Sequence, residues 1–181
     1  FKEISAHFKA KKKLQVSLKY LKEIGGSSLT DKKMNVSRHG TKNRGSVPTS
    51  YVPFRNTQII SIATAWAETI GAEAIFVGAT EIDGSGYPDC RKKYFTAMRR
   101  VINEGTRDET KILLETPLIS LNKKEIIKLG SELKTPFHLT WSCYKNNDIA
   151  CGECDSCYYR LKGFHEAGEY DPVEYMVYPK F

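Results

Sequence analysis

Four of the five cysteines lie in one short segment, and this clustering constrains the fold more than any other feature of the sequence. The segment WSCYKNNDIACGECDSC runs from residue 141 to residue 157. The cysteine spacing is C-x7-C-x2-C-x2-C, formed by Cys143, Cys151, Cys154 and Cys157. Thiols this close in sequence form disulfides, carry out redox chemistry or bind a metal ion.

Metal binding explains the spacing best. A C-x2-C pair places two sulfurs on one ion, and four thiolates complete a tetrahedral zinc site. Gly152 eases the first turn, and a helix start would put Cys154 and Cys157 on one face. A disulfide framework suits a small, loop-rich fold and would leave one thiol unpaired. An iron–sulfur cluster, which four thiolates also bind, stays open as the alternative. The remaining thiol, Cys90, is expected to be a buried apolar residue.

Composition narrows the classes of protein. Hydrophobic residues make up 40% and charged residues 27% of the 181 residues, as in soluble globular domains. No apolar run approaches the length of a membrane span, and no signal peptide is visible, so we expect a cytoplasmic protein without a membrane partner. The net charge of +7 favours anionic partners such as nucleotides. The basic segments 9–13 and 32–44 lack interleaved aromatics, so a nucleic-acid platform is not indicated.

Hydrophobic periodicity predicts an α/β fold. We expect short apolar strands at 14–18, 74–79 and 111–119, a loop at 32–48, and helices at 1–13, 56–72, 91–105 and 122–133. Alternating strands and helices favour a parallel sheet flanked by helices. Ligands of such sheets bind beyond the carboxyl ends of the strands. The predicted binding loops therefore begin near Gly78 and Ser120.

Candidate site residues follow from this placement. Arg55, just before a predicted helix, would act in catalysis by stabilising a phosphate or leaving pyrophosphate, or would form a surface salt bridge. Asn56 would cap the helix and contribute to the nucleotide site. Gly78 ends a strand, where a missing side chain allows a nucleotide to approach. The loop candidates for recognition of a purine-like base are Ser85, Gly86, Tyr87 and Asp89. Tyr87 would stack on the base, and Asp89 would accept two of its N–H donors or cap the next helix.

Motifs along nearly the whole chain carry a family resemblance. They are IGGSSLTD (24–31), YVPFRN (51–56), SGYPDCR (85–91), ETPLISLNKKEIIKLG (115–130), the cysteine segment and YDPVEY (170–175). Together they resemble the 7-cyano-7-deazaguanine synthase family of queuosine biosynthesis. Its SGYPDCR and CGECDSC motifs are specific enough that we do not expect both by chance.

The resemblance implies a fold, a reaction and a set of ligands. It implies a Rossmann-like α/β domain (1–140) that binds nucleotide and substrate, followed by a zinc-binding segment (141–181) of the same domain. It implies conversion of 7-carboxy-7-deazaguanine and ammonia to 7-cyano-7-deazaguanine with ATP and Mg²⁺, through adenylated intermediates, with release of AMP and pyrophosphate. It further implies one zinc ion on the four cysteines, a homodimer, and a charge-neutralising role for Lys123, with Lys124 as its rival.

One expected motif is missing, and it leaves other functions open. The family's phosphate loop, SGGxDS, does not occur, and the glycines of IGGSSLTD match a later stretch of the family. We therefore expect domain 1–140 to be incomplete at its N-terminus and these 181 residues alone to be inactive. The alternatives are a related enzyme that attaches a deazaguanine to DNA or protein, and a non-enzymatic zinc-ribbon nucleic-acid binder.

Overall fold

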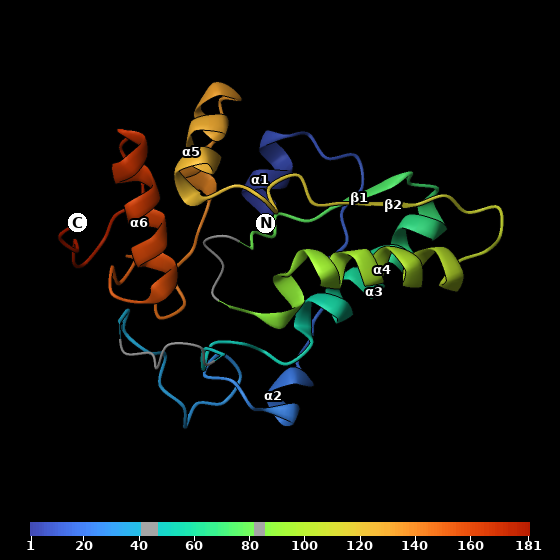
Figure 1. Ribbon diagram of the computed structural model, residues 1–181, viewed down its shortest axis with the longest axis horizontal. Coiled ribbons are helices and arrows are strands. Elements are labelled where there is room, and N and C mark those ends of the chain that lie inside the picture. Colours follow the sequence, from blue (N-terminus) through green and yellow to red (C-terminus); the bar gives the residue numbers. More distant parts are fainter. Residues whose placement is uncertain (41–46, 82–85) are drawn as a thin grey trace. The chain divides into compact units, whose positions relative to one another are not determined.

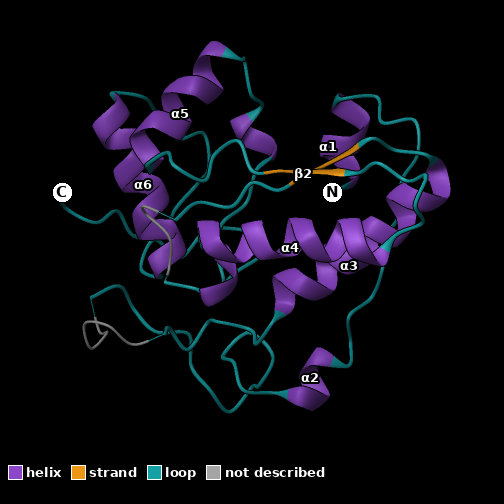
Figure 2. Cartoon of the chain, turned by 45° about the vertical axis from the view of Figure 1, so that its right-hand side comes forward, coloured by secondary structure: helices purple, strands orange, loops and turns teal. Residues whose placement is uncertain are grey.

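The chain divides into two compact units. The computed structural model describes residues 1–40, 47–81 and 86–181, and helices predominate among them (Figures 1 and 2). The first unit consists of Phe1–Lys42 and Lys123–Phe181, and the second of Asn43–Asn122. The domain boundary expected after residue 140 stays a prediction. Among the described helices, none has the length and apolar character that crossing a bilayer requires.

The second unit contains a small parallel sheet. Strand β1 (Ala74–Phe76) pairs with β2 (Leu113–Glu115), with Ile75 opposite Leu114. Parallel neighbours need a crossover, and the 3₁₀ helix η1 (Pro88–Cys90) and helix α4 (Lys92–Gly105) lie in that connection. The sequence therefore predicted the α/β class and the parallel pairing correctly, although both strands are shorter than expected.

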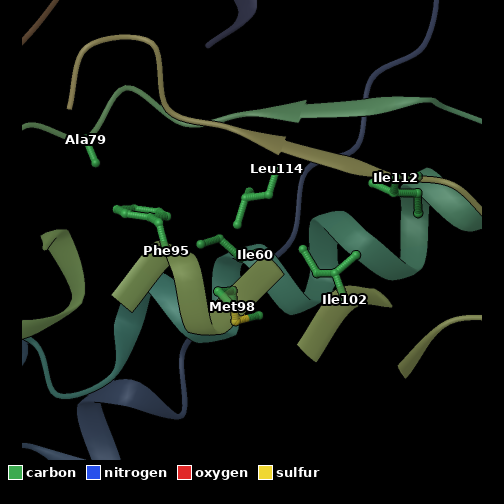
Figure 3. Close-up of a cluster of buried hydrophobic side chains, with 8 residues drawn as sticks. Ile60, Ala79, Phe95, Met98, Ile102, Ile112 and Leu114 are labelled. Carbon is green, nitrogen blue, oxygen red and sulfur yellow. The ribbon is translucent and has the colours of Figure 1, made fainter. Parts of the chain in front are cut away.

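Helices α3 (Arg55–Ile70) and α4 supply the core of this unit by packing on one face of the sheet. Phe95, Met98 and Ile102 recur at i, i+3 and i+7 on α4, so they line one helical stripe. Figure 3 shows them beside Leu114 of β2 and Ile60 of α3. The predicted end of α3 is confirmed, because the helix stops at Gly71, which adopts a left-handed φ of 67°.

The chain segments that follow the two strands are hydrogen-bonded to each other. The N–H of Val77 donates to the carbonyl of Glu115 at 2.9 Å, and the N–H of Glu81 donates to the carbonyl of Ile119 at 3.1 Å. These bonds extend the pairing beyond the strands proper. They fix Gly78 at the carboxyl end of the sheet, which is the end where ligands of parallel sheets bind.

The first unit contains the remaining helices: α1 (Lys2–His7), α2 (Leu21–Ile24), α5 (Lys123–Glu132), the 3₁₀ helix η2 (Phe137–Leu139) and α6 (Asp155–Ala167). Glycines allow α5 to pack closely against α6 and against η2. A Cβ atom on Gly163 of α6 would lie 2.7 Å from the Cβ of Lys123. A Cβ atom on Gly130 of α5 would collide with the ring of Phe137.

Two local predictions were wrong. Residues 14–18 form no strand, and Leu14 and Val16 remain exposed. Alternation marks a strand only where another strand supplies backbone partners, and the described residues offer none to this segment. The helix predicted over residues 1–13 ends at His7, and the residues after it form turns and extended chain.

A buried ion pair fastens the C-terminal tail of the first unit. Arg160 of α6 donates to both carboxylate oxygens of Asp171, at 2.7 and 2.8 Å, and to the hydroxyl of Thr140. The hydroxyl of Tyr175 donates to Asp171 at 2.7 Å. Burial by itself lowers the pKa of Arg160, but its bonds to Asp171 raise that pKa above the ordinary value. Burial, and then the bond to Asp171, raise the pKa of Tyr175.

Removing one partner of this pair will destabilise the first unit. Arg160→Met leaves the Asp171 carboxylate buried without its cation, which costs about 3–5 kcal/mol of unfolding free energy. Urea denaturation monitored by circular dichroism measures the loss. The control is Lys162→Ala on the same helix, since within the described part of the chain Lys162 forms only an exposed i,i+4 pair with Glu166. Exposed pairs contribute at most about 1 kcal/mol. Equal losses in both variants would contradict the importance of the buried pair.

Candidate metal centre and strand-end site

The four clustered cysteines converge in the first unit. The sulfur atoms of Cys143, Cys151, Cys154 and Cys157 all lie within 4.8 Å of one another, and all four residues are buried. The Sγ atoms of Cys151 and Cys157 are 3.9 Å apart. A tetrahedral zinc ion with Zn–S bonds of about 2.3 Å requires S···S distances of about 3.8 Å. The sulfurs are therefore spaced for a single ion.

Local backbone geometry explains this convergence. Cys154 is the residue before the first turn of α6 and Cys157 lies in that turn, as their spacing predicted. Gly152 has a φ of 76°, which side chains rarely tolerate, and a Cβ there would collide with the carbonyl of Val177. The turn between Cys151 and Cys154 therefore requires glycine for two independent reasons.

Hydrogen bonds to the sulfurs favour the thiolate form at Cys143 and Cys154. The N–H groups of Lys145, Asn146 and Cys151 donate to the Sγ of Cys143 at 3.3–3.4 Å. Burial raises the pKa of Cys143, but these donors outweigh it, and the pKa falls below the ordinary value. A hydrogen bond from Cys157 lowers the pKa of Cys154 to about 5. Burial raises the pKa of Cys151, and the bond to Cys154 raises that of Cys157, so a metal ion would displace the protons of these two thiols on binding.

The donor set fits a single soft or borderline ion, and it is consistent with zinc. An iron–sulfur cluster places several iron and sulfide atoms between its thiolates, which would hold the cysteine sulfurs further apart than they lie here. The burial of all four sulfurs leaves no open coordination position toward solvent. A closed four-thiolate site is typical of structural rather than catalytic zinc.

A basic segment from the N-terminal part of the chain packs against this centre. Arg38 forms an antiparallel bridge with Cys154, and its guanidinium lies 3.2 Å from the carboxylate of Glu153. The ring of His39 stacks on Tyr158 with centroids 3.5 Å apart, and its Nδ1 lies 2.9 Å from a carboxylate oxygen of Asp155. Asp155 is therefore partnered rather than solvated. Nothing in the local sequence around His39 signalled this contact.

The loop expected at 32–48 lies partly outside the described residues. Its residues 36–39 are held against the cysteine cluster, where Val36 packs, and the N–H of His39 donates to the carbonyl of Glu153 at 2.8 Å. The C-terminal tail is held in the same way, because the N–H of Ala150 donates to Glu174 and that of Met176 donates to Ala150. The cluster thus anchors segments from both ends of the chain.

The second unit brings together the motifs that contain Arg55 and Asp89. Asp89 is 3% exposed, and its Oδ2 accepts the backbone N–H of Asn56 at 3.0 Å. The side-chain amide of Asn56 donates to the carbonyl of Asp89 and to the Sγ of Cys90. The prediction that Asn56 caps α3 was wrong, because Asn56 lies inside the first turn and Asp89 caps the helix instead. Cys90 is half-buried and hydrogen-bonded rather than a buried apolar residue.

The residue before α3 is in an unusual conformation. Phe54 has a φ of 59°, a left-handed value that is rare for a bulky side chain, and its ring is exposed. The hydroxyl of Tyr51 accepts its N–H at 3.0 Å. This sharp reversal sets the start of α3 at Arg55 and places the guanidinium-bearing residue in the first turn. Among the described residues, the Arg55 side chain has no hydrogen bond or ion pair.

The other predicted base-recognition residues lie beside Asp89 in the chain. Tyr87 is buried, its hydroxyl lies 2.8 Å from that of Ser50, and its ring packs at a tilt against Tyr51. Gly86 has a φ of 77°, so the turn before Tyr87 requires glycine. Ser85 lies outside the described residues.

Gly78 and Lys123 complete the predicted set. A Cβ atom on Gly78 would meet nothing within 4 Å, and its backbone is not left-handed, so no contact among the described residues requires glycine at this position. Lys123 begins α5 and belongs to the first unit with the cysteines, whereas Arg55, Gly78 and Asp89 belong to the second. Lys123 is half-buried and Lys124 is exposed.

Comparisons with known proteins find a matching family and similar sequences over all or nearly all of the chain. Residues 1–168 match the family described as queuosine biosynthesis protein QueC. The 7-cyano-7-deazaguanine synthase of Chlorobium phaeobacteroides is 51% identical over 182 residues, covering 100% of this chain and 80% of that protein. The synthase of the same name from Chloroherpeton thalassium is 46% identical, again over 100% of this chain and 80% of the relative.

Disrupting the cysteine cluster will remove the metal. Cys157→Ser replaces a fully buried sulfur with a poor ligand, so the purified variant should contain less than a tenth of the metal of the wild type, on the order of 0.1 ion per chain. Its unfolding free energy should fall by at least about 3 kcal/mol, because bound metal stabilises only the folded state. Elemental analysis and denaturant titration provide these values.

The matched control is Cys90→Ser. It removes the thiol outside the cluster and should leave the metal content unchanged. Full metal content in Cys157→Ser, or an iron signal with acid-labile sulfide in the wild type, would contradict the single-ion site.

Proposed function

Because this chain belongs to the queuosine biosynthesis protein QueC family, we propose that it forms 7-cyano-7-deazaguanine from 7-carboxy-7-deazaguanine, ammonia and ATP. The observation that carries the proposal is identity of about one half to synthases of that name, extending over the full length of this chain. The enzyme acts on a small molecule, and a divalent cation such as Mg²⁺ accompanies the ATP.

The proposed chemistry converts a carboxylate to a nitrile in two activations. The substrate carboxylate attacks the α-phosphate of ATP, which forms an acyl adenylate and releases pyrophosphate. Ammonia displaces AMP and gives the primary amide. The amide oxygen then attacks the α-phosphate of a second ATP and releases a second pyrophosphate, and loss of AMP and of the two N–H protons leaves the nitrile. The enzyme's part is to position the three substrates and to stabilise the negative charge of the leaving groups.

Arg55 is the proposed partner of the leaving pyrophosphate. Guanidinium groups bind phosphate oxygens in a bidentate fashion, and an arginine already paired with a carboxylate would lose that capacity. The surface salt bridge considered as its alternative role does not occur among the described residues. Its backbone is fixed in the first turn of α3, directly after the chain reversal at Phe54. These features support a binding role for Arg55.

Gly78 is the proposed point of close approach for the nucleotide. Glycine is needed where the backbone is left-handed, where a neighbour leaves no room, or where a ligand comes close. The first two reasons do not apply to Gly78, since its backbone is ordinary and a methyl group added at its Cα would meet none of the described residues within 4 Å. Its place at the carboxyl end of β1 supports the third reason.

The four cysteines are proposed to hold one zinc ion with a structural role. Cys143, Cys151, Cys154 and Cys157 would supply all four ligands, so the ion stabilises the α6 region and offers no position to substrate. Lys123 is proposed to neutralise a phosphate or the substrate carboxylate. A homodimer in the cytoplasm completes the proposal and can be checked by sedimentation and by cell fractionation.

A direct assay tests the reaction. The full-length gene product, including any residues that precede Phe1, is incubated with ATP, Mg²⁺, ammonia and 7-carboxy-7-deazaguanine. We expect AMP, pyrophosphate and 7-cyano-7-deazaguanine, identified by chromatography and mass spectrometry, with the amide as an intermediate. Product formation that does not depend on the carboxylate substrate, or the absence of AMP, would refute the proposal.

A glycine substitution tests the nucleotide site. Gly78→Ala should leave the melting temperature within about 2 °C of the wild type, because the added methyl meets open space and the change in stability stays small. The KM for ATP should rise about tenfold or more, which corresponds to a steric loss of roughly 1.4 kcal/mol. Steady-state kinetics with varied ATP gives the value.

Gly105→Ala provides the matched control, because a Cβ there also meets nothing within 4 Å but lies at the end of α4. That variant should keep the wild-type KM for ATP. An unchanged KM in Gly78→Ala would remove this glycine from the nucleotide site.

A further inference from the structure

The Asp89 carboxylate has one satisfied oxygen and one unsatisfied oxygen. Its Oδ2 accepts the N–H of Asn56 at 3.0 Å, in the first turn of α3. Its Oδ1 is buried and has no hydrogen-bond partner among the described residues. A buried polar atom without a partner is costly, and the cost is greater for a carboxylate. Oδ1 therefore lacks a donor, which a bound molecule could supply.

The surroundings keep the carboxylate in one orientation. Both hydrogens of the Asn56 side-chain amide are used, one on the carbonyl of Asp89 at 2.9 Å and one on the Sγ of Cys90 at 3.3 Å. Asn56 thus makes three hydrogen bonds to residues 89–90: one to the Asp89 carboxylate, one to the Asp89 carbonyl and one to the Cys90 sulfur. A carboxylate held at both its backbone and one of its oxygens cannot rotate freely, so the direction of Oδ1 is fixed.

The charge of this arrangement selects the class of ligand. A helix N-terminus attracts anions, but here a carboxylate already occupies the end of α3. An anion in direct contact with Oδ1 would meet like-charge repulsion, whereas an N–H donor there would satisfy this oxygen. The group that fits is an uncharged or cationic N–H edge, such as the lactam and amino edge of a guanine-like base.

We propose that Asn56 is a positioning residue that holds Asp89 so that Oδ1 reads an N–H donor on the heterocyclic base of the substrate. This inference rests on the proposed function for the identity of the base. It assigns Asn56 a role toward Asp89 instead of the expected contact with the nucleotide. On this inference, base specificity in this unit comes from hydrogen-bond acceptance by Asp89 Oδ1 rather than from ring stacking.

Three substitutions and one substrate analogue test the proposal. Asp89→Asn keeps an oxygen that can accept the Asn56 N–H, and it places an NH₂ group where the ligand requires an acceptor. Asn56→Ala removes the side-chain bonds and leaves the backbone N–H. Thr57→Val is the control, because it removes one bond from the same turn of α3, to the hydroxyl of Tyr94 at 2.9 Å, without touching Asp89. The analogue is 7-carboxy-7-deazaguanine without its 2-amino group.

The expected results separate positioning from structural support. Asp89→Asn should raise the KM for the deazapurine about tenfold or more and abolish the preference of the wild type for the amino-bearing base. Asn56→Ala should raise the same KM, and the double variant should resemble Asp89→Asn alone, since the two residues act through one contact. Thr57→Val should lower the melting temperature slightly and leave the KM unchanged.

Each contrary outcome has a distinct meaning. If the wild type turns over the substrate but both Asn56→Ala and Asp89→Asn keep its KM and base preference, the inference is wrong and the proposed function stands. A rise in KM that is equal in Thr57→Val and Asn56→Ala would reduce Asn56 to structural support and also overturn it. If the wild type neither turns over nor binds the deazapurine in calorimetry, both the function and the inference fail.

Discussion

The convergence of four sulfurs determines the structure of the first unit. Their segment has little regular structure before α6, so its backbone needs partners elsewhere. The sulfurs themselves accept several N–H groups, and the backbone of the segment pairs with residues 38–39 and 174–176. A bound ion would neutralise the thiolates that these donors favour. The metal centre therefore organises segments from both ends of the chain, and its influence extends well beyond its ligands.

The second unit depends on a different interaction, the carboxylate of Asp89 at the start of α3. Arg55 and Asn56 follow a strained reversal, and Asp89 follows the first strand by a loop, so the two motifs are distant in sequence. A negative charge at a helix N-terminus is favourable, which makes this contact a stable junction between them. This contact uses only one oxygen of Asp89. The other, Oδ1, is buried without a hydrogen-bond donor among the described residues.

Local patterns in the sequence predicted what depends on local physics. The stripe on α4, the stop of α3 at Gly71 and the placement of Cys154 and Cys157 follow from spacing alone. Contacts between distant segments could not be predicted this way. The pairing of His39 with Asp155 depends on tertiary packing that no periodicity encodes. The prediction of a strand at 14–18 was wrong for the same reason, because a strand requires hydrogen bonds to a neighbouring strand that local sequence does not reveal.

The close approach of α5 and α6 bears on which lysine serves the proposed reaction. A side chain at position 163 would collide with the Cβ of Lys123, so the glycine there allows α5 and α6 to approach. The backbone carbonyl of Lys123 lies close to the same position. The start of α5 is therefore fixed against α6, which leaves Lys123 half-buried and turns Lys124 to solvent. Because the backbone and Cβ of Lys123 have a fixed place and its side chain is the less exposed of the two, we propose Lys123 rather than Lys124 as the lysine of the reaction.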